Sequence, residues 1–180
     1  FHRSYNEKNW RILPRQAVHD SSIVTYPVFT AIAAPEVQNK LNGDFAIIAG
    51  PYLQNLATGG CELDYTLTFV SEKFISMVFF GVLDEGEKEI FAKIPLNIDV
   101  QTGAQLALGD VLNLRDADLL PVLRLLTKKD KVDFSKGIPE SWYYNGTNFV
   151  FCQRSETGEW LEATVAASDL KKFLLKPELF

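Results

Sequence analysis

The order of apolar and polar positions predicts one long helix in the first third of the chain. Apolar side chains recur at spacings of three and four over positions 35–58, which is typical of one face of a helix. Pro35 suits a first helical residue, and Gly59-Gly60 supply a stop. Gly50-Pro51 interrupts the stripe, and because proline removes a backbone hydrogen bond, we expect a kink there or a division into two helices.

The pattern then changes to a period of two, which is typical of strands. Residues 61–69 alternate, residues 74–83 are apolar on both faces, and residues 90–100 alternate again. Three consecutive strands predict an antiparallel meander whose central strand is covered on each side. Asn97 and Asp99 fall in the opposite phase to the apolar residues of the third strand, so we expect them on its wet face.

Shorter elements flank this meander. Residues 23–29 are rich in β-branched and aromatic side chains, and Pro27 among them favours an edge strand. Asp118 is a suitable N-cap for a second helix, and Asn145-Gly146 predicts the turn of a hairpin. A last strand is expected at residues 160–166, followed by a short terminal helix.

The sum of these elements predicts an α+β fold. Its sheet should be mainly antiparallel, a meander plus a hairpin, packed by one long helix and a shorter second helix. No repeat, linker or low-complexity segment divides the sequence, so we expect a single domain over residues 1–180. Residues 1–22 show no clear period and are expected to form an amino-terminal arm or edge strand.

Composition narrows the classes of function. Hydrophobic residues make up 47% and charged residues 23% of the chain, as in an ordinary globular protein. A net charge of −5 without a basic stretch argues against binding to nucleic acid. No apolar run approaches the roughly 20 residues that cross a bilayer. Phe1-His2-Arg3 is neither a signal peptide nor a methionine start, so we expect a processed piece that meets a membrane only through a segment outside this chain.

Residues that commonly carry catalysis are scarce. The two histidines, His2 and His19, both fall in the amino-terminal arm, which gives little support to a histidine triad or a zinc site. No phosphate-binding, nucleophile-elbow or metalloprotease motif occurs. We therefore expect no catalytic residue, metal or cofactor. The alternative is a hydrolase that acts on cell-wall glycan or peptide through carboxylates alone.

Four acids gather in the turn between the second and third meander strands, and they are the first candidates for binding. A solvated hairpin tip explains them more simply than a calcium loop, because Lys88 interrupts the run and the spacing differs. Exposed acids can still speed the association of a basic partner. The four are Asp84, Glu85, Glu87 and Glu89.

Aromatic residues near the predicted hairpin are the second candidates. Trp142, Tyr143 and Trp160 could form a platform for a sugar or a peptide, since aromatic faces stack on apolar ligand surfaces. Core packing explains them at least as well.

Two cysteines, Cys61 and Cys152, are too few for a structural zinc site or a disulfide scaffold. Two separate buried thiols are favoured. One disulfide between them is possible in an oxidising compartment, provided that the two Cα atoms lie within about 7 Å.

One segment resembles a family signature. Residues 97–112, NIDVQTGAQLALGDVL, match N-x-D-x-x-T-G-x-x-L-x-L-x-D-[LV]-[LF], which is similar to the extracytoplasmic domain of RsiV anti-sigma factors, also found on PdaC peptidoglycan deacetylases. The order of predicted elements agrees over about residues 23–174, which would form an RsiV-like core. Residues 81–85 and 152–156 depart from the pattern of those relatives.

The resemblance implies a bacterial module on the outer side of the cytoplasmic membrane. In the anti-sigma relatives this module binds lysozyme, and in the deacetylases it accompanies a separate catalytic domain. We therefore expect a non-catalytic extracytoplasmic module of the cell envelope that senses or binds a lysozyme-like protein or a wall component. An accessory domain of a peptidoglycan-modifying enzyme is the alternative that the resemblance leaves open.

Overall fold

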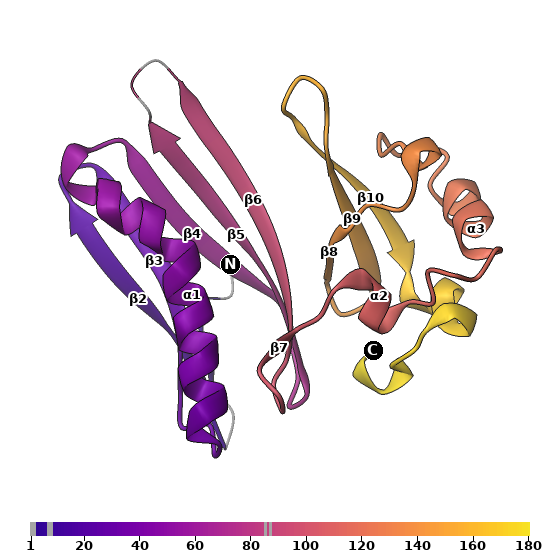
Figure 1. The fold of residues 1–180 in the computed structure, drawn as a ribbon, viewed down its shortest axis with the longest axis horizontal. Helices are drawn as coiled ribbons and strands as arrows, with labels where there is room; N and C mark the ends of the chain where they lie inside the picture. Colours follow the sequence, from indigo (N-terminus) through magenta and orange to yellow (C-terminus); the bar gives the residue numbers. More distant parts are fainter. Residues whose placement is uncertain (1–2, 7–8, 85, 87) are drawn as a thin grey trace.

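The computed structural model describes residues 3–6, 9–84, 86 and 88–180. Within them the strands form a seven-stranded sheet in chain order from β1 to β7 and a three-stranded sheet in the order β10-β9-β8 (Figure 1). Neighbouring strands are antiparallel except β3 and β4, so the predicted α+β class with a mainly antiparallel sheet is confirmed. The strands of the large sheet are β1 (Tyr5–Asn6), β2 (Arg11–His19), β3 (Ser22–Thr30), β4 (Cys61–Val70), β5 (Phe74–Asp84), β6 (Glu89–Asp99) and β7 (Ala104–Gln105).

The long helix α1 (Pro35–Asn55) crosses one face of the large sheet and continues as a 3₁₀ turn, Leu56–Thr58 (Figure 1). Its buried residues recur every three or four positions and join the first hydrophobic cluster. The helix passes through Pro51 without a break, so the predicted division into two helices is wrong. The bond lost at Pro51 leaves the carbonyl of Ile47 unpaired within the helix, and Ile47 lies on the exposed side, where water can bind.

Strand β3 lies between β2 and β4, so the prediction of an edge strand there is wrong. The proline that suggested an edge is tolerated because β4 pairs with β3 only at Ile23 and Val24. Pro27 lies beyond these pairs, where one side of β3 has no strand. The parallel pairing follows from the crossover through α1, which returns the chain in the same direction.

A side chain of α1 satisfies this open part of β3. The Asn42 Oδ1 atom accepts from the Phe29 backbone N–H at 2.7 Å, and the Asn42 Nδ2 atom donates to the Phe29 carbonyl at 3.0 Å. The amide thus forms the two hydrogen bonds that a neighbouring strand would form. This pair of bonds fixes the helix against the sheet at one position.

The predicted meander is confirmed as β4, β5 and β6. Alternation along β5 places Ile75, Met77 and Phe79 in the first cluster, under α1. Phe74, Ser76, Val78, Phe80 and Val82 alternate to the opposite side, which we call the outer face of the sheet. Phe74, on the outer face, belongs to a second hydrophobic cluster.

This second cluster lies within the carboxyl-terminal part of the chain. Strands β8 (Ser141–Tyr144) and β9 (Asn148–Arg154) form the predicted hairpin around Asn145-Gly146, and β10 (Trp160–Ala166) is the predicted last strand. Four short helices complete it: α2 (Leu108–Val111), α3 (Leu119–Leu126), and the 3₁₀ segments Phe134–Lys136 and Ala167–Phe173, with a 3₁₀ turn at Pro177–Leu179. Asp118 is the N-cap residue of α3 as predicted, but its side chain accepts from Lys172 and makes no cap bond.

A buried polar network joins the two sheets. Ser76 Oγ donates to Asn97 Oδ1 at 2.7 Å, and Asn97 Nδ2 donates to the Trp142 carbonyl at 2.7 Å. Tyr144 N donates to Ser76 Oγ at 2.8 Å. Asn97 is therefore buried, and the prediction that it lies on a wet face is wrong, because β8 covers this end of the outer face.

The two cysteines lie on opposite sides of the large sheet. Cys61 belongs to the first cluster, and its Sγ atom lies 3.3 Å from the Tyr52 carbonyl of α1. Cys152 is on β9 and faces Glu162, a residue of β10. Both are free, buried thiols, and the structure contains no bridge between them. The intervening sheet is the physical reason.

Gly81 allows α1 to approach β5 closely. A Cβ atom at Gly81 would overlap the ring and hydroxyl of Tyr52, which is buried in the first cluster. We expect Gly81→Ala to lower the free energy of unfolding by about 1–3 kcal/mol, measured by urea denaturation. Gly43→Ala is the matched control: Gly43 is exposed within α1, no atom outside its own stretch of helix lies within 4 Å of the added methyl group, and we expect the change to stabilise by about 0.5–1 kcal/mol. Similar effects of both changes would contradict this account of the contact.

The buried network generates a second stability prediction. Asn97→Ala leaves the Trp142 carbonyl without its donor, and we expect a loss of about 2 kcal/mol in the free energy of unfolding. Combined with Ser76→Ala, the loss should fall short of the sum of the single losses by at least about 0.5 kcal/mol, because both residues belong to one network. Strict additivity in this double-mutant cycle would show that the two side chains act independently.

Candidate binding groove

The second sheet covers only one end of the outer face, and the uncovered end forms a groove. The groove has a volume of about 670 Å³. It lies over β4, β5 and β6 at the end near the β5–β6 hairpin, and Trp160 of β10 forms part of one wall. Figure 1 shows the β5–β6 and β9–β10 hairpins extending to the same side of the molecule. The lining residues are Glu62, Asp64, Thr66, Phe80, Gly81, Val82, Phe91, Ala92, Lys93 and Trp160.

Aromatic side chains form much of the groove surface. Phe80 on β5 and Phe91 on β6 are 43% and 51% exposed, which is high for large apolar side chains. Trp160 begins β10 and is partly buried, with the Arg154 guanidinium 5.9 Å from its ring centroid. An exposed apolar patch of this kind, rimmed by polar residues, is typical of a binding surface.

An ion pair closes the end of the groove nearest to the second sheet. The Lys93 ammonium on β6 pairs with the Glu162 carboxylate on β10, and the Lys93 side chain is only 13% exposed. It also lies 5.7 Å from the Phe80 ring and 5.6 Å from the Tyr143 ring. Tyr143 Oη donates to Glu162 Oε1 at 3.1 Å. The cluster links the large sheet to the small one and orients Lys93 along the groove.

The remaining polar groups of this cluster are poorly suited to nucleophilic chemistry. Burial raises the pKa of the Cys152 thiol to about 12, although Lys93 acts in the opposite sense. The thiol is therefore protonated at neutral pH, whereas the thiolate is the nucleophilic form. Burial and the neighbouring Glu162 carboxylate also raise the pKa of Tyr143, so its hydroxyl remains a hydrogen-bond donor.

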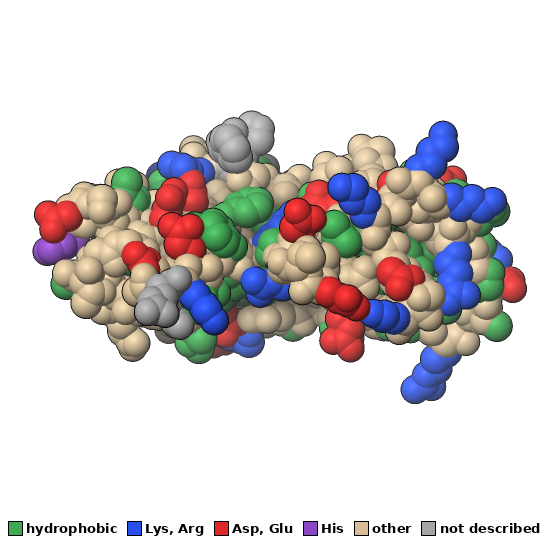
Figure 2. All heavy atoms as spheres, turned by 90° about the horizontal axis from the view of Figure 1, so that it is seen from above, with side chains coloured by type: hydrophobic (Ala, Val, Ile, Leu, Met, Phe, Trp, Pro, Cys, Tyr) green, Lys and Arg blue, Asp and Glu red, His purple; other side chains and the backbone are tan. Residues whose placement is uncertain are grey.

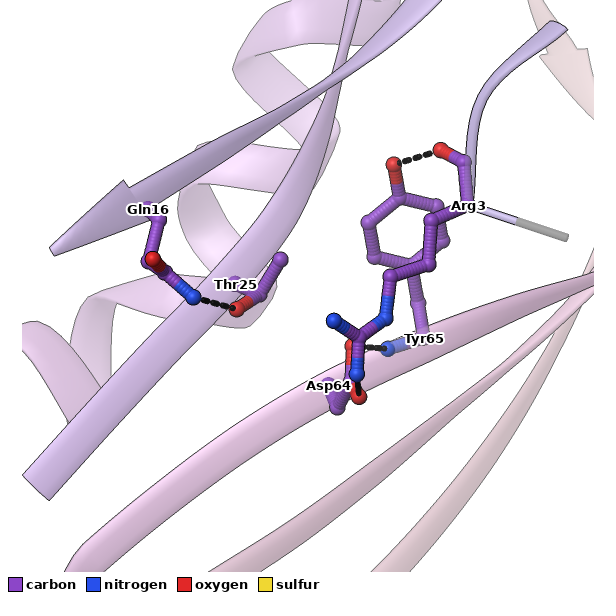
Figure 3. A network of polar contacts seen from close by, with 5 residues as sticks. All are labelled: Arg3, Gln16, Thr25, Asp64 and Tyr65. Carbon is purple, nitrogen blue, oxygen red and sulfur yellow. Dashed lines mark hydrogen bonds and ion pairs between the residues drawn. The ribbon is translucent and has the colours of Figure 1, made fainter. Parts of the chain in front are cut away.

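The amino-terminal arm holds a second carboxylate at the groove. Arg3 forms an ion pair with Asp64 of β4, and the Arg3 carbonyl accepts a hydrogen bond from the Tyr65 hydroxyl (Figure 3). Burial raises the pKa of Tyr65, which keeps that donor protonated. Figure 3 also shows Gln16 of β2 bound to Thr25, its cross-strand partner on β3. The arm thus lies against β4 beside the groove.

Acidic side chains surround the groove on the side of the β5–β6 hairpin. Glu62, Asp84 and Glu89 are exposed and form no ion pair with another described residue. Figure 2 shows acidic side chains next to a hydrophobic patch on this side of the molecule. Two of the four acids predicted to bind, Glu85 and Glu87, lie outside the described residues.

The predicted aromatic platform does not form as a unit. Trp142 is buried in the second cluster, where its ring stacks on Phe149 at a centroid distance of 5.4 Å. Tyr143, whose side chain alternates to the other face of β8, lies at the ion pair, and Trp160 lines the groove. Only these last two lie near the candidate site, because neighbouring residues of a strand point to opposite faces.

Sequence reasoning missed four residues of the site. Phe80, Phe91 and Glu162 lie within predicted strands, but the pattern along the sequence assigns them no role in binding. Lys93 gave no usable signal, because it has the same phase as Glu89, Asn97 and Asp99, the polar residues of β6. Its pairing with Glu162 depends on the position of the second sheet, which local periodicity does not specify.

Two searches of the described residues are negative. No group of three or more His, Cys, Asp or Glu side chains is placed to hold a metal ion. No described helix is long and apolar enough to span a bilayer.

Comparison with known proteins gives structural neighbours only. No protein-family model matches the chain, and no curated protein matches it. The crystal structure of a DUF3298 family member from Bacteroides fragilis is similar, with a TM-score of 0.63, 12% sequence identity and 91% of each chain covered. A DUF3298 family protein from Pseudomonas aeruginosa PAO1 gives a TM-score of 0.59 and 14% identity over 95% of each chain. The chain therefore shares the fold of these bacterial DUF3298 proteins.

Proposed function

We propose that this domain is a non-catalytic binding module of the bacterial cell envelope, with a lysozyme-like basic protein as its ligand. The resemblance of residues 97–112 to the RsiV signature supports an RsiV-like assignment and an extracytoplasmic location. The two bacterial neighbours are compatible with it, since they share the fold over nearly the whole chain.

The observation that carries the proposal is an exposed apolar surface, formed by Phe80 and Phe91, beside acidic residues that form no ion pair with another described residue. Phe80 and Phe91 expose large apolar surfaces, and a partner that covers them would gain affinity by removing this surface from water. The carboxylates of Glu62, Asp84 and Glu89 would attract a basic protein and raise the rate of association. The apolar surface and the acidic rim thus have separate roles, which two experiments can distinguish.

The apolar surface is tested with Phe91→Ser. We expect at least about tenfold weaker binding to a basic lysozyme in a surface-binding assay, because the truncated ring no longer fills the contact. Ile47→Ser is the matched control: Ile47 is 74% exposed on α1, on the opposite face of the sheet, and its loss should leave binding unchanged. If wild type fails to bind at low salt, or if both variants bind equally well, the proposed use of the groove is wrong.

The acidic rim is tested by its effect on rates. Asp84→Asn combined with Glu89→Gln should slow association at low salt several-fold and leave dissociation almost unchanged, because exposed charges act mainly by steering. The difference should shrink at physiological salt. Glu156→Gln with Glu178→Gln removes the same charge from exposed positions outside the groove lining and serves as control. Equal association rates for the two double variants would show that Asp84 and Glu89 are solvated side chains that do not steer the partner.

A further inference from the structure

We propose that the ligand is held through an extended segment that adds as a strand to the free edge of β6, at Glu89, Phe91 and Lys93. This inference rests on the proposed function and deepens it, because it states how the chain of the partner is bound in the groove. Strand addition supplies main-chain hydrogen bonds for affinity, while alternate side chains of the added segment provide specificity.

The edge of β6 that faces away from β5 is paired over a short length only. β5 lies along β6 from Glu89 to Asp99, whereas on the other side β7 pairs only with Ile98 and Asp99. A further bond runs from Leu106 N to the Asn97 carbonyl. Toward the hairpin tip, no described strand pairs with this side of β6.

The register shows which backbone groups are free. The carbonyl of Asn97 points away from β5, because it accepts from outside the β5–β6 ladder. Backbone direction alternates with a period of two in an antiparallel strand. The N–H and C=O groups of Glu89, Phe91 and Lys93 therefore point the same way. They would donate to and accept from an added strand without disturbing the bonds to β5.

Pro95 marks the end of this free edge. It has the same phase as Lys93 and lacks an N–H group, so a strand cannot form a complete set of bonds there. Beyond it, the outward carbonyl of Asn97 already accepts a hydrogen bond from Leu106 N, and β7 pairs with Ile98 and Asp99. The available edge therefore lies between Glu89 and Lys93, next to the groove.

The surroundings define the chemistry of the added segment. A strand beside β6 would place every second side chain over the outer face, next to Phe91 and toward Trp160, so these positions favour apolar residues. Glu89 and Asp84 lie at the hairpin end and are complementary to basic residues. The occupant is therefore an extended segment of the basic partner in which apolar and basic residues alternate.

A comparison of two substitutions at one position tests the backbone bond. Both Phe91→Ala and Phe91→Pro remove the ring, but only proline removes the outward N–H group. Because this group takes no part in the ladder with β5, both variants should fold, as circular dichroism would show. We expect Phe91→Pro to bind lysozyme about five- to tenfold more weakly than Phe91→Ala. Equal affinities of the two variants would contradict strand addition.

Amide hydrogen exchange in the wild-type protein gives a readout that does not depend on the variants. Adding lysozyme should slow exchange at the amides of Phe91 and Lys93 at least about tenfold, whereas Ile90 and Ala92, already bonded to β5, should change little. If lysozyme binds and Phe91→Ser weakens it, but these amides exchange at their free rates, strand addition is wrong and the proposed function stands. If wild type binds no lysozyme, both proposals fail.

Discussion

The structure depends on one constraint: β5 is apolar on both faces, so both faces must be covered by other elements. α1 covers one face of β5, where Ile75, Met77 and Phe79 pack in the first cluster. The other face is buried from Phe74 to Val78, and the small sheet is joined to it at Ser76 through Tyr144 and Asn97. Phe80, near the far end of β5, has no cover from either element. The groove is thus the uncovered remainder of a surface whose other parts are buried.

The local pattern of apolar, polar and turn residues was sufficient to predict the main helices and strands of this fold. The meander, the hairpin at Asn145-Gly146 and the long helix all follow from periodicity and turn residues, since these properties depend on neighbours along the chain. Pro27 and Pro51 misled the prediction, because the cost of a missing N–H depends on what lies beside it. Pro27 is tolerated because β4 pairs with β3 only at Ile23 and Val24. Pro51 is tolerated because the carbonyl that loses its hydrogen bond, that of Ile47, lies on the exposed side of α1.

The site was predicted less well than the fold, and the reason lies in the second layer. Asn97 has the phase of a solvent-exposed residue, yet it is buried because β8 packs over it. Lys93, with the same phase, meets Glu162 from a strand about 70 residues later in the sequence. Trp142 and Tyr143 are neighbours in the sequence but face a core and a groove respectively. Which layer covers which strand is a long-range property that a pattern along one strand does not contain.

The Asn42 side chain, which binds both backbone groups of Phe29, has a consequence for how this protein behaves at high concentration. An exposed strand edge can recruit another chain and start aggregation, and proteins protect such edges with charges, prolines or covering elements. The open part of β3 is protected twice, by Pro27 and by the amide of Asn42. β6 has Pro95, but no side chain of the described residues binds the outward backbone groups of Phe91 as Asn42 binds those of Phe29. The molecule thus protects one edge against self-association and leaves the other accessible to a partner.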